Sequence, residues 1–283
     1  MCPSFIALFS KAGIACAADA DHTIYSLSKD YPVAIAVNPA SPIPWEQIIE
    51  EYRRRPFQEH SAFSDYGKDF EAYLETVPVQ PGLTSLSAEE SNIILMGFGS
   101  EDLFPAALDV MVSVQDGKLC FCDLKADGIT HRNIVFFYLL GNHESIATLL
   151  WGSTAQVRQY LYDEQLKRFE TASRRVSEKF KGTKYESYVK KHLDAFDYQA
   201  YASSILDRST DKTLDELKMG IGSFSIEDMV TAVESLTKAN AKLNYLRSGA
   251  KGPSAEVREI AVMTIPEGLT WIKHSLFYRR NEL

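Results

Sequence analysis

The sequence has few cysteines, only four in 283 residues. A chain of this length with so few cysteines lacks the disulfide framework that stabilises small secreted domains. We therefore expect a reducing compartment, and the predicted localisation is cytoplasmic. Cys16 lies in an apolar run, where it is typical of a small core residue.

The chain also lacks an excess of positive charge. Its 30 Lys and Arg residues are outnumbered by 38 Asp and Glu residues, which gives a net charge of −8. Proteins that bind nucleic acids usually carry a basic stripe, so we expect no nucleic-acid partner. Between Glu164 and Lys191 the basic residues alternate with acids in a helical pattern, which is typical of solvated helix faces.

Long apolar runs are missing as well. No stretch approaches the roughly 20 residues that a membrane span needs, so we expect no membrane partner. The apolar run Phe5 to Leu8 has no Lys or Arg before it, and Lys11 and Gly13 interrupt its continuation. This pattern does not favour a signal peptide.

Motifs for metals and cofactors are absent from the sequence. The six histidines are scattered, and His143-Glu144 has no second histidine one helical turn later. Gly97-Phe98-Gly99 lacks the third glycine and the following helix of a dinucleotide-binding loop. We expect no bound metal and no cofactor.

The pattern of apolar residues predicts strands and helices that alternate in blocks. Strands are predicted at Ser4–Ser10, Ile14–Asp19, Tyr31–Val37, Asn92–Phe98, Ala106–Val114, Lys118–Leu124, Thr130–Leu139, Val257–Thr264 and Leu269–Lys273. Helices are predicted at Pro44–Tyr52, Ser61–Thr76, Ser153–Asp207 with a break near Gly182, and Ser225–Leu246 with Ser225 as its cap. Asp116-Gly117 predicts a tight hairpin turn.

Blocks of strands and blocks of helices are typical of an α+β protein in which stacked sheets carry helices outside. The sequence shows no internal repeat and no low-complexity linker. We therefore predict a single domain over residues 1–283, with a helical excursion at about 153–220.

Four segments, in order, resemble the bacterial proteasome-like branch of the N-terminal-nucleophile hydrolases, a family of the proteasome β-subunit type. They are Phe5–Asp19, Ile43–Arg53, Gly97–Pro105 and the pair Ile260–Val262 with Gly268–Lys273. The resemblance implies a four-layer αββα sandwich of two antiparallel sheets. It also implies a homo-oligomer built as rings or stacks.

The resemblance also implies a catalytic set. In this family the first residue of the mature chain is the nucleophile, and its own α-amino group is the general base, since that amine titrates near neutral pH. An aspartate and a lysine surround the nucleophile, and the lysine's charge favours its deprotonated form. Asp19 matches the aspartate and Lys29 is the best match for the lysine. Without the resemblance, Asp19 would simply end a strand and Lys29 would lie in a solvated turn.

The nucleophile does not fit the family spacing. Counting back from Asp19 leads to Pro3, which has neither a nucleophile nor a primary amine. Cys2 becomes N-terminal if Met1 is removed, and its thiolate would then lie beside its own amine. Against this, Pro3 hinders removal of Met1. A one-residue offset along a strand also turns a side chain to the other face.

The oxyanion position is also unusual. Relatives carry a glycine where this chain has Ala36, followed by Val37. A backbone N–H at Ala36 or Val37 is the predicted oxyanion donor. Glycine often occupies such a position because other residues adopt its conformation poorly.

Three interpretations follow. The chain is a peptide or small-amide hydrolase that uses Cys2 with Asp19 and Lys29, an inactive relative that acts as an assembly or binding subunit, or an unrelated α+β protein. Asp19 and Lys29 favour the first interpretation. Pro3 and the missing glycine favour the second.

Overall fold

The computed structural model describes residues 4–56, 58–79, 83, 85–130, 133–141, 144–151, 155–204, 218–248 and 256–274. The chain divides into two compact units. One unit, the sandwich unit, combines Met1–Ile146 with Lys218–Leu283, and the other, the helical unit, is Ala147–Leu217. The helical unit covers most of the stretch that the sequence predicts as a helical excursion.

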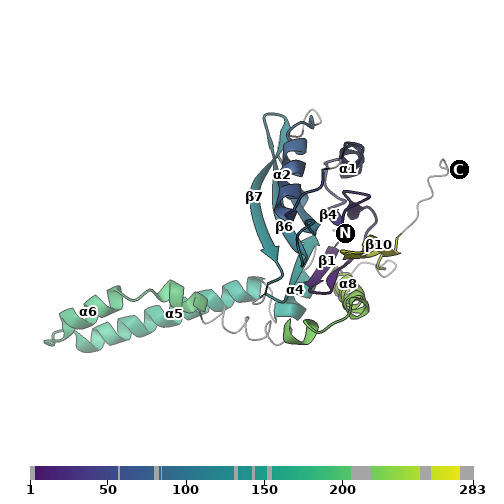
Figure 1. Cartoon of the computed structure of the whole chain (residues 1–283). Helices are drawn as coiled ribbons and strands as arrows, with labels where there is room; N and C mark the ends of the chain where they lie inside the picture. Colours follow the sequence, from purple (N-terminus) through teal and green to yellow (C-terminus); the bar gives the residue numbers. More distant parts are fainter. Residues whose placement is uncertain are drawn as a thin grey trace. The chain divides into compact units, whose positions relative to one another are not determined.

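The sandwich unit is built on two five-stranded sheets in which all neighbouring strands are antiparallel (Figure 1). The first sheet has the order β10-β9-β2-β1-β8. Its strands are β1 Ser4–Ser10, β2 Gly13–Ala18, β8 Val135–Gly141, β9 Glu259–Thr264 and β10 Gly268–Lys273. The second sheet has the order β3-β4-β5-β6-β7. Its strands are β3 Ile24–Ser26, β4 Val33–Val37, β5 Asn92–Gly97, β6 Ala106–Gln115 and β7 Lys118–Gly128.

The two sheets pack face to face and carry helices on their outer faces. Phe9 and Phe136 of the first sheet share one buried cluster with Ala34 and Ala36 of the second. A separate cluster holds α1 (Trp45–Arg53) and α2 (Phe63–Leu74) on the outer face of the second sheet. Helix α8 (Ile226–Ser248) packs on β1 and β2 of the first sheet. The predicted α+β class with two antiparallel sheets is confirmed.

Local chemistry explains several element boundaries. Asp116 and Gly117 take positive φ values of 51° and 73°, as a two-residue hairpin turn requires, so this prediction is confirmed. The Ser225 hydroxyl accepts from the Asp228 amide at 3.2 Å, and the Asp228 carboxylate accepts from the Ser225 amide at 3.1 Å. This reciprocal cap starts α8, as predicted.

Other boundaries differ from the prediction. Strand β4 begins at Val33 rather than Tyr31, because Pro32 has no N–H to donate to the sheet. Strand β8 begins at Val135 rather than Thr130, and the Thr130 amide donates instead to the Asn133 carbonyl at 2.9 Å. The short strand β3, the one-turn helix α3 (Ala88–Ser91) and the helix α4 (Glu144–Trp151) were not predicted from the sequence.

The helical unit contains α5 (Ala155–Phe180), α6 (Glu186–Asp194) and a further helical run at 198–204. The break near Gly182 is confirmed: this glycine has φ 75° in the turn between α5 and α6. An aromatic cluster joins α5 to the segment after α6 through contacts of Phe169 with Tyr198 and Tyr201. In the part of the chain that the structure describes, no helix is both long and apolar enough to cross a membrane.

Candidate functional site

The end of the β1–β2 hairpin holds the predicted aspartate. Asp19 follows β2 directly and lies opposite Ser4, the first residue of β1. Its carboxylate accepts from the Ser4 amide at 2.6 Å and from the Ser4 hydroxyl at 2.8 Å. Burial raises the pKa of the Asp19 carboxyl, and the two hydrogen bonds from Ser4 oppose that rise. Ser4 is thus the hydrogen-bond donor to the Asp19 carboxylate, a role that the sequence did not predict.

Lys29 lies elsewhere in the sandwich unit. Its side chain is exposed on the loop between β3 and β4, and it lines a cavity of about 380 Å³ together with Pro266 and Glu267 of the β9–β10 turn. The β9–β10 turn follows the last residues of β9, which pair with Ile14 near the start of β2. Asp19 follows the last residue of β2, which pairs with the first residue of β9. The six residues of β2 span about 20 Å. The structure therefore does not bring Asp19 and Lys29 together.

The predicted oxyanion donors lie at the end of β4, between β3 and β5 of the second sheet. Ala36 is paired on one side with Ile24 of β3 and on the other with Ile94 of β5. The Val37 amide donates to the Thr23 carbonyl at 2.9 Å. Because this N–H already has a backbone acceptor, Val37 is not a free donor for an oxyanion.

The predicted nucleophile, Cys2, lies outside the described residues, as do Met1 and Pro3. The described free cysteines are Cys16, Cys120 and Cys122. Burial raises the pKa of the Cys16 thiol to about 12, and its Glu259 neighbour adds to that rise. Such a thiol stays protonated at neutral pH and is a poor nucleophile, so Cys16 acts as the core residue that the sequence indicates.

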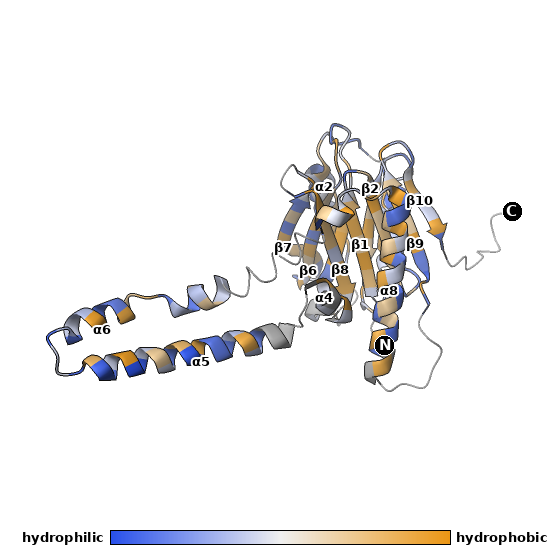
Figure 2. Ribbon diagram, turned by 90° about the horizontal axis from the view of Figure 1, so that it is seen from below, coloured by the Kyte–Doolittle hydropathy of each residue, from blue (hydrophilic) through white to orange (hydrophobic). Residues whose placement is uncertain are grey.

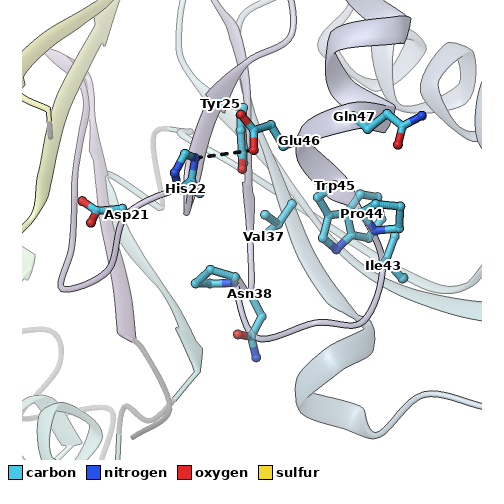
Figure 3. Close-up of a pocket in the computed structure, with 11 residues that line it drawn as sticks. Asp21, His22, Tyr25, Val37, Asn38, Ile43, Pro44, Trp45, Glu46 and Gln47 are labelled. Carbon is cyan, nitrogen blue, oxygen red and sulfur yellow. Dashed lines mark ion pairs between the residues drawn. The ribbon is translucent and has the colours of Figure 1, made fainter. Parts of the chain in front are cut away.

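A cavity opens beside the turn that follows Asp19. Its volume is about 520 Å³, and three segments form it: the β2–β3 turn with β3, the end of β4, and the start of α1 (Figure 3). The Nδ1 atom of His22 lies 3.9 Å from a carboxylate oxygen of Glu46 across this cavity. The lining residues are Asp21, His22, Tyr25, Val37, Asn38, Pro39, Ile43, Pro44, Trp45, Glu46 and Gln47.

Aromatic and polar groups in this cavity can recognise a small ligand. Trp45 is buried, and its indole N–H has no hydrogen-bond partner among the described residues. Tyr25 contributes a second ring. Burial raises the pKa of Tyr25 well above its usual range, and the nearby Glu46 carboxylate adds to the rise. Cavities of this size, with apolar walls and a few polar groups, are typical of ligand-binding sites.

A buried carboxylate fixes the turn that forms the cavity wall. Glu259, the first residue of β9, accepts from the backbone amides of His22, Thr23 and Ile24 at 3.0, 3.2 and 3.0 Å. His22 has φ 60°, a left-handed conformation that few non-glycine residues adopt. Burial raises the pKa of Glu259, and the three amide donors oppose the rise. Glu259 therefore positions the turn without entering the cavity.

Sequence reasoning had no signal for this arrangement. An acid at the start of a strand, such as Glu259, is ordinary at a solvated strand end. Its role depends on the antiparallel pairing of β9 with β2, which brings residues more than 230 positions apart together. A local pattern cannot report such a pairing.

Neither a scan against protein-family models nor a search of curated proteins finds a match for this chain. Within the described ranges, no group of three or more His, Cys, Asp or Glu side chains is arranged to hold a metal ion.

Proposed function

We propose that this chain is a proteasome-like protein of the N-terminal-nucleophile hydrolase type that works without catalysis, as a binding or assembly subunit. The architecture supports this proposal. Two antiparallel sheets pack face to face, helices cover both outer faces, and the first hairpin ends in Asp19. These features agree with what the sequence resemblance implies. A cytoplasmic homo-oligomer is part of the same proposal.

The observation that carries the non-catalytic interpretation is the separation of Asp19 from Lys29. A cation favours a deprotonated nucleophile only within about 4–6 Å. Lys29 lies near the opposite end of β2, and the groups that hold the Asp19 carboxylate are the amide and hydroxyl of Ser4. A carboxylate held by Ser4 stabilises the end of the β1–β2 hairpin. It does not have Lys29 beside it to favour the deprotonated form of a nucleophile.

The oxyanion position supports the same conclusion. The Val37 amide is bonded to Thr23, and Ala36 lies within the ladders of β4. The cavity beside α1 is formed nevertheless, with Tyr25 and Trp45 in its wall. We infer that this cavity binds a peptide or small amide without cleaving it.

Covalent labelling tests the proposal. We expect an electrophilic, amide-mimicking inhibitor to leave the N-terminal peptide unmodified, so that wild type and Cys2→Ala gain the same mass on treatment. The exposed Cys122 is the control, since a simple alkylating agent should modify it and show that the reagents reach the protein. One adduct per chain at Cys2, lost in Asp19→Asn, would overturn the non-catalytic interpretation.

The second candidate is an amide hydrolase with Cys2 as nucleophile. The position of Asp19 at the end of β2, which the resemblance implies for the family's aspartate, supports this candidate. Terminal peptide mapping decides whether Met1 is removed: a chain that retains Met1 has no free amine at Cys2.

A further inference from the structure

Within the helical unit, the stretch around the α5–α6 turn concentrates positive charge. From Lys167 to Lys191 the chain has nine Lys and Arg residues against three Glu residues, and all nine cationic side chains are exposed. We call this stretch, which joins α5 to α6, the basic hairpin. Since the whole chain has 30 basic and 38 acidic residues, the remainder holds 21 and 35. One protein thus carries a basic segment and a strongly acidic remainder.

The basic hairpin does not neutralise its own charge. Among the described residues, the ion pairs join other side chains, and none involves any of these nine cations. Lys184 lies 5.1 Å from the centre of the Tyr185 ring, a contact that leaves its charge in place. The hairpin therefore presents a net positive field to a partner.

Exposed aromatic rings accompany the charge. Tyr185 is 52% exposed and Tyr188 is 64% exposed, and both lie between Lys184 and Lys190. Tyr is enriched at the centres of protein–protein interfaces, where it contributes much of the binding energy. Lys is depleted at such centres, so the two exposed rings, rather than the lysines beside them, are the feature of the hairpin tip that is typical of a docking surface.

We propose that the basic hairpin docks on the acidic sandwich unit of a second copy of this chain, an inference that rests on the proposed assembly role. The sandwich unit holds 27 acidic and 18 basic residues. This excess of negative charge is the complement that the hairpin needs, and opposite potentials steer association. A nucleic acid is a poorer partner, because the same acidic remainder repels a polyanion. If the contact forms in both directions between two copies it closes a two-fold dimer, and otherwise it generates rings or open chains.

Sedimentation velocity of the full-length protein tests the docking. At about 0.05 M salt we expect oligomers, and at about 0.5 M salt we expect association at least about tenfold weaker, because the screening length falls severalfold. The triple variant Arg174→Glu, Arg175→Glu and Lys179→Glu changes exposed positions of α5 and should weaken association to the same extent. Circular dichroism of this variant checks that its helices persist.

A matched control separates docking from net charge. Lys118→Glu, Lys242→Glu and Lys273→Glu change the net charge by the same amount at exposed positions of the sandwich unit. We expect this variant to associate as well as wild type or better, since it adds acid to the acceptor side. Equal weakening in both variants would show a general charge effect and reject the docking.

Two further outcomes also decide. If wild type associates and the hairpin variant associates equally well, the docking is wrong while the assembly role stands. If wild type is monomeric at low salt, the docking and the assembly role are both wrong. The non-catalytic interpretation is tested separately, by covalent labelling at Cys2. Tight binding of a duplex oligonucleotide by the hairpin of a monomeric protein would assign the surface to nucleic acid instead.

Discussion

Helices α8 and α5 have similar lengths, 23 and 26 residues, but opposite environments. On α8, Met229, Val233 and Thr237 are fully buried at intervals of four, so one side of the helix packs against the first sheet. On α5, none of the side chains described from Gln159 onward is buried, and Figure 2 shows polar and apolar residues distributed along the helix. Isolated helices are only marginally stable in water, because most helix stability in proteins comes from packing. A long helix without a buried face indicates either marginal stability or a partner.

The largest expected difference in stability is between variants of two glutamates that accept backbone hydrogen bonds. Glu259 is buried and accepts from three amides, whereas Glu186 is exposed and accepts from the Gly182 amide. We expect Glu259→Ala to reduce the free energy of unfolding by about 3 kcal/mol, because it leaves three backbone donors, two of them buried, without an acceptor. Glu186→Ala should cost about 0.5 kcal/mol or less, as surface substitutions usually do. Urea denaturation followed by circular dichroism measures both.

The intermediate variant Glu259→Gln keeps an acceptor oxygen and removes the charge. Its loss of stability should fall between those of wild type and Glu259→Ala. Equal losses for Glu259→Ala and Glu186→Ala would contradict the role of Glu259 in holding the β2–β3 turn.

Two valines make the comparison of the helices direct. Val233 on α8 is fully buried, and Val176 on α5 is 39% exposed. We expect Val233→Ala to cost about 2 kcal/mol of unfolding free energy, through lost burial and the cavity left behind. Val176→Ala should change stability by no more than about 0.5 kcal/mol, since alanine is also the better helix former. A cost at Val176 as large as that at Val233 would mean that α5 packs against a partner under the conditions of the measurement.

A smaller effect concerns pH. Burial raises the pKa of Asp19 in the folded protein, so the folded state holds this proton more tightly than the unfolded state. The contribution of Asp19 to the free energy of unfolding should therefore fall as the pH rises from the ordinary pKa of a carboxyl group to the raised pKa of Asp19. The stability of wild type relative to Asp19→Asn should decrease over that window and be constant above it. Denaturation at several pH values measures the difference, and an increase with pH would contradict the sign.

Elements whose signals are local could be predicted from the sequence. The β1 bounds Ser4 and Ser10 are confirmed, because a continuous apolar run ends at turn residues. The Asp116-Gly117 turn is confirmed because only a few residues adopt its backbone conformation. Strand β3 escaped prediction, because three residues are too few to establish a period.

The candidate site was less predictable. The sequence placed Asp19 at the end of a strand, and the structure agrees. The roles proposed for Asp19 and Lys29 stay predictions. The sequence resemblance implied that the two residues share a site, but the ten residues between them do not determine the direction in which the chain runs. In between, the chain runs through β3 along the second sheet and leaves Lys29 beside the β9–β10 turn.

The sequence by itself determined the α+β class, most of the strands, the cap of α8 and the break at Gly182, since propensity, apolar period and turn chemistry act over a few neighbouring residues. Tertiary structure decided what meets at each sheet end. Antiparallel pairing brought Glu259 under the His22 turn, joined Ser4 to Asp19 and separated Lys29 from both. These contacts depend on long-range register, which burial of whole sheet faces selects and no local pattern encodes.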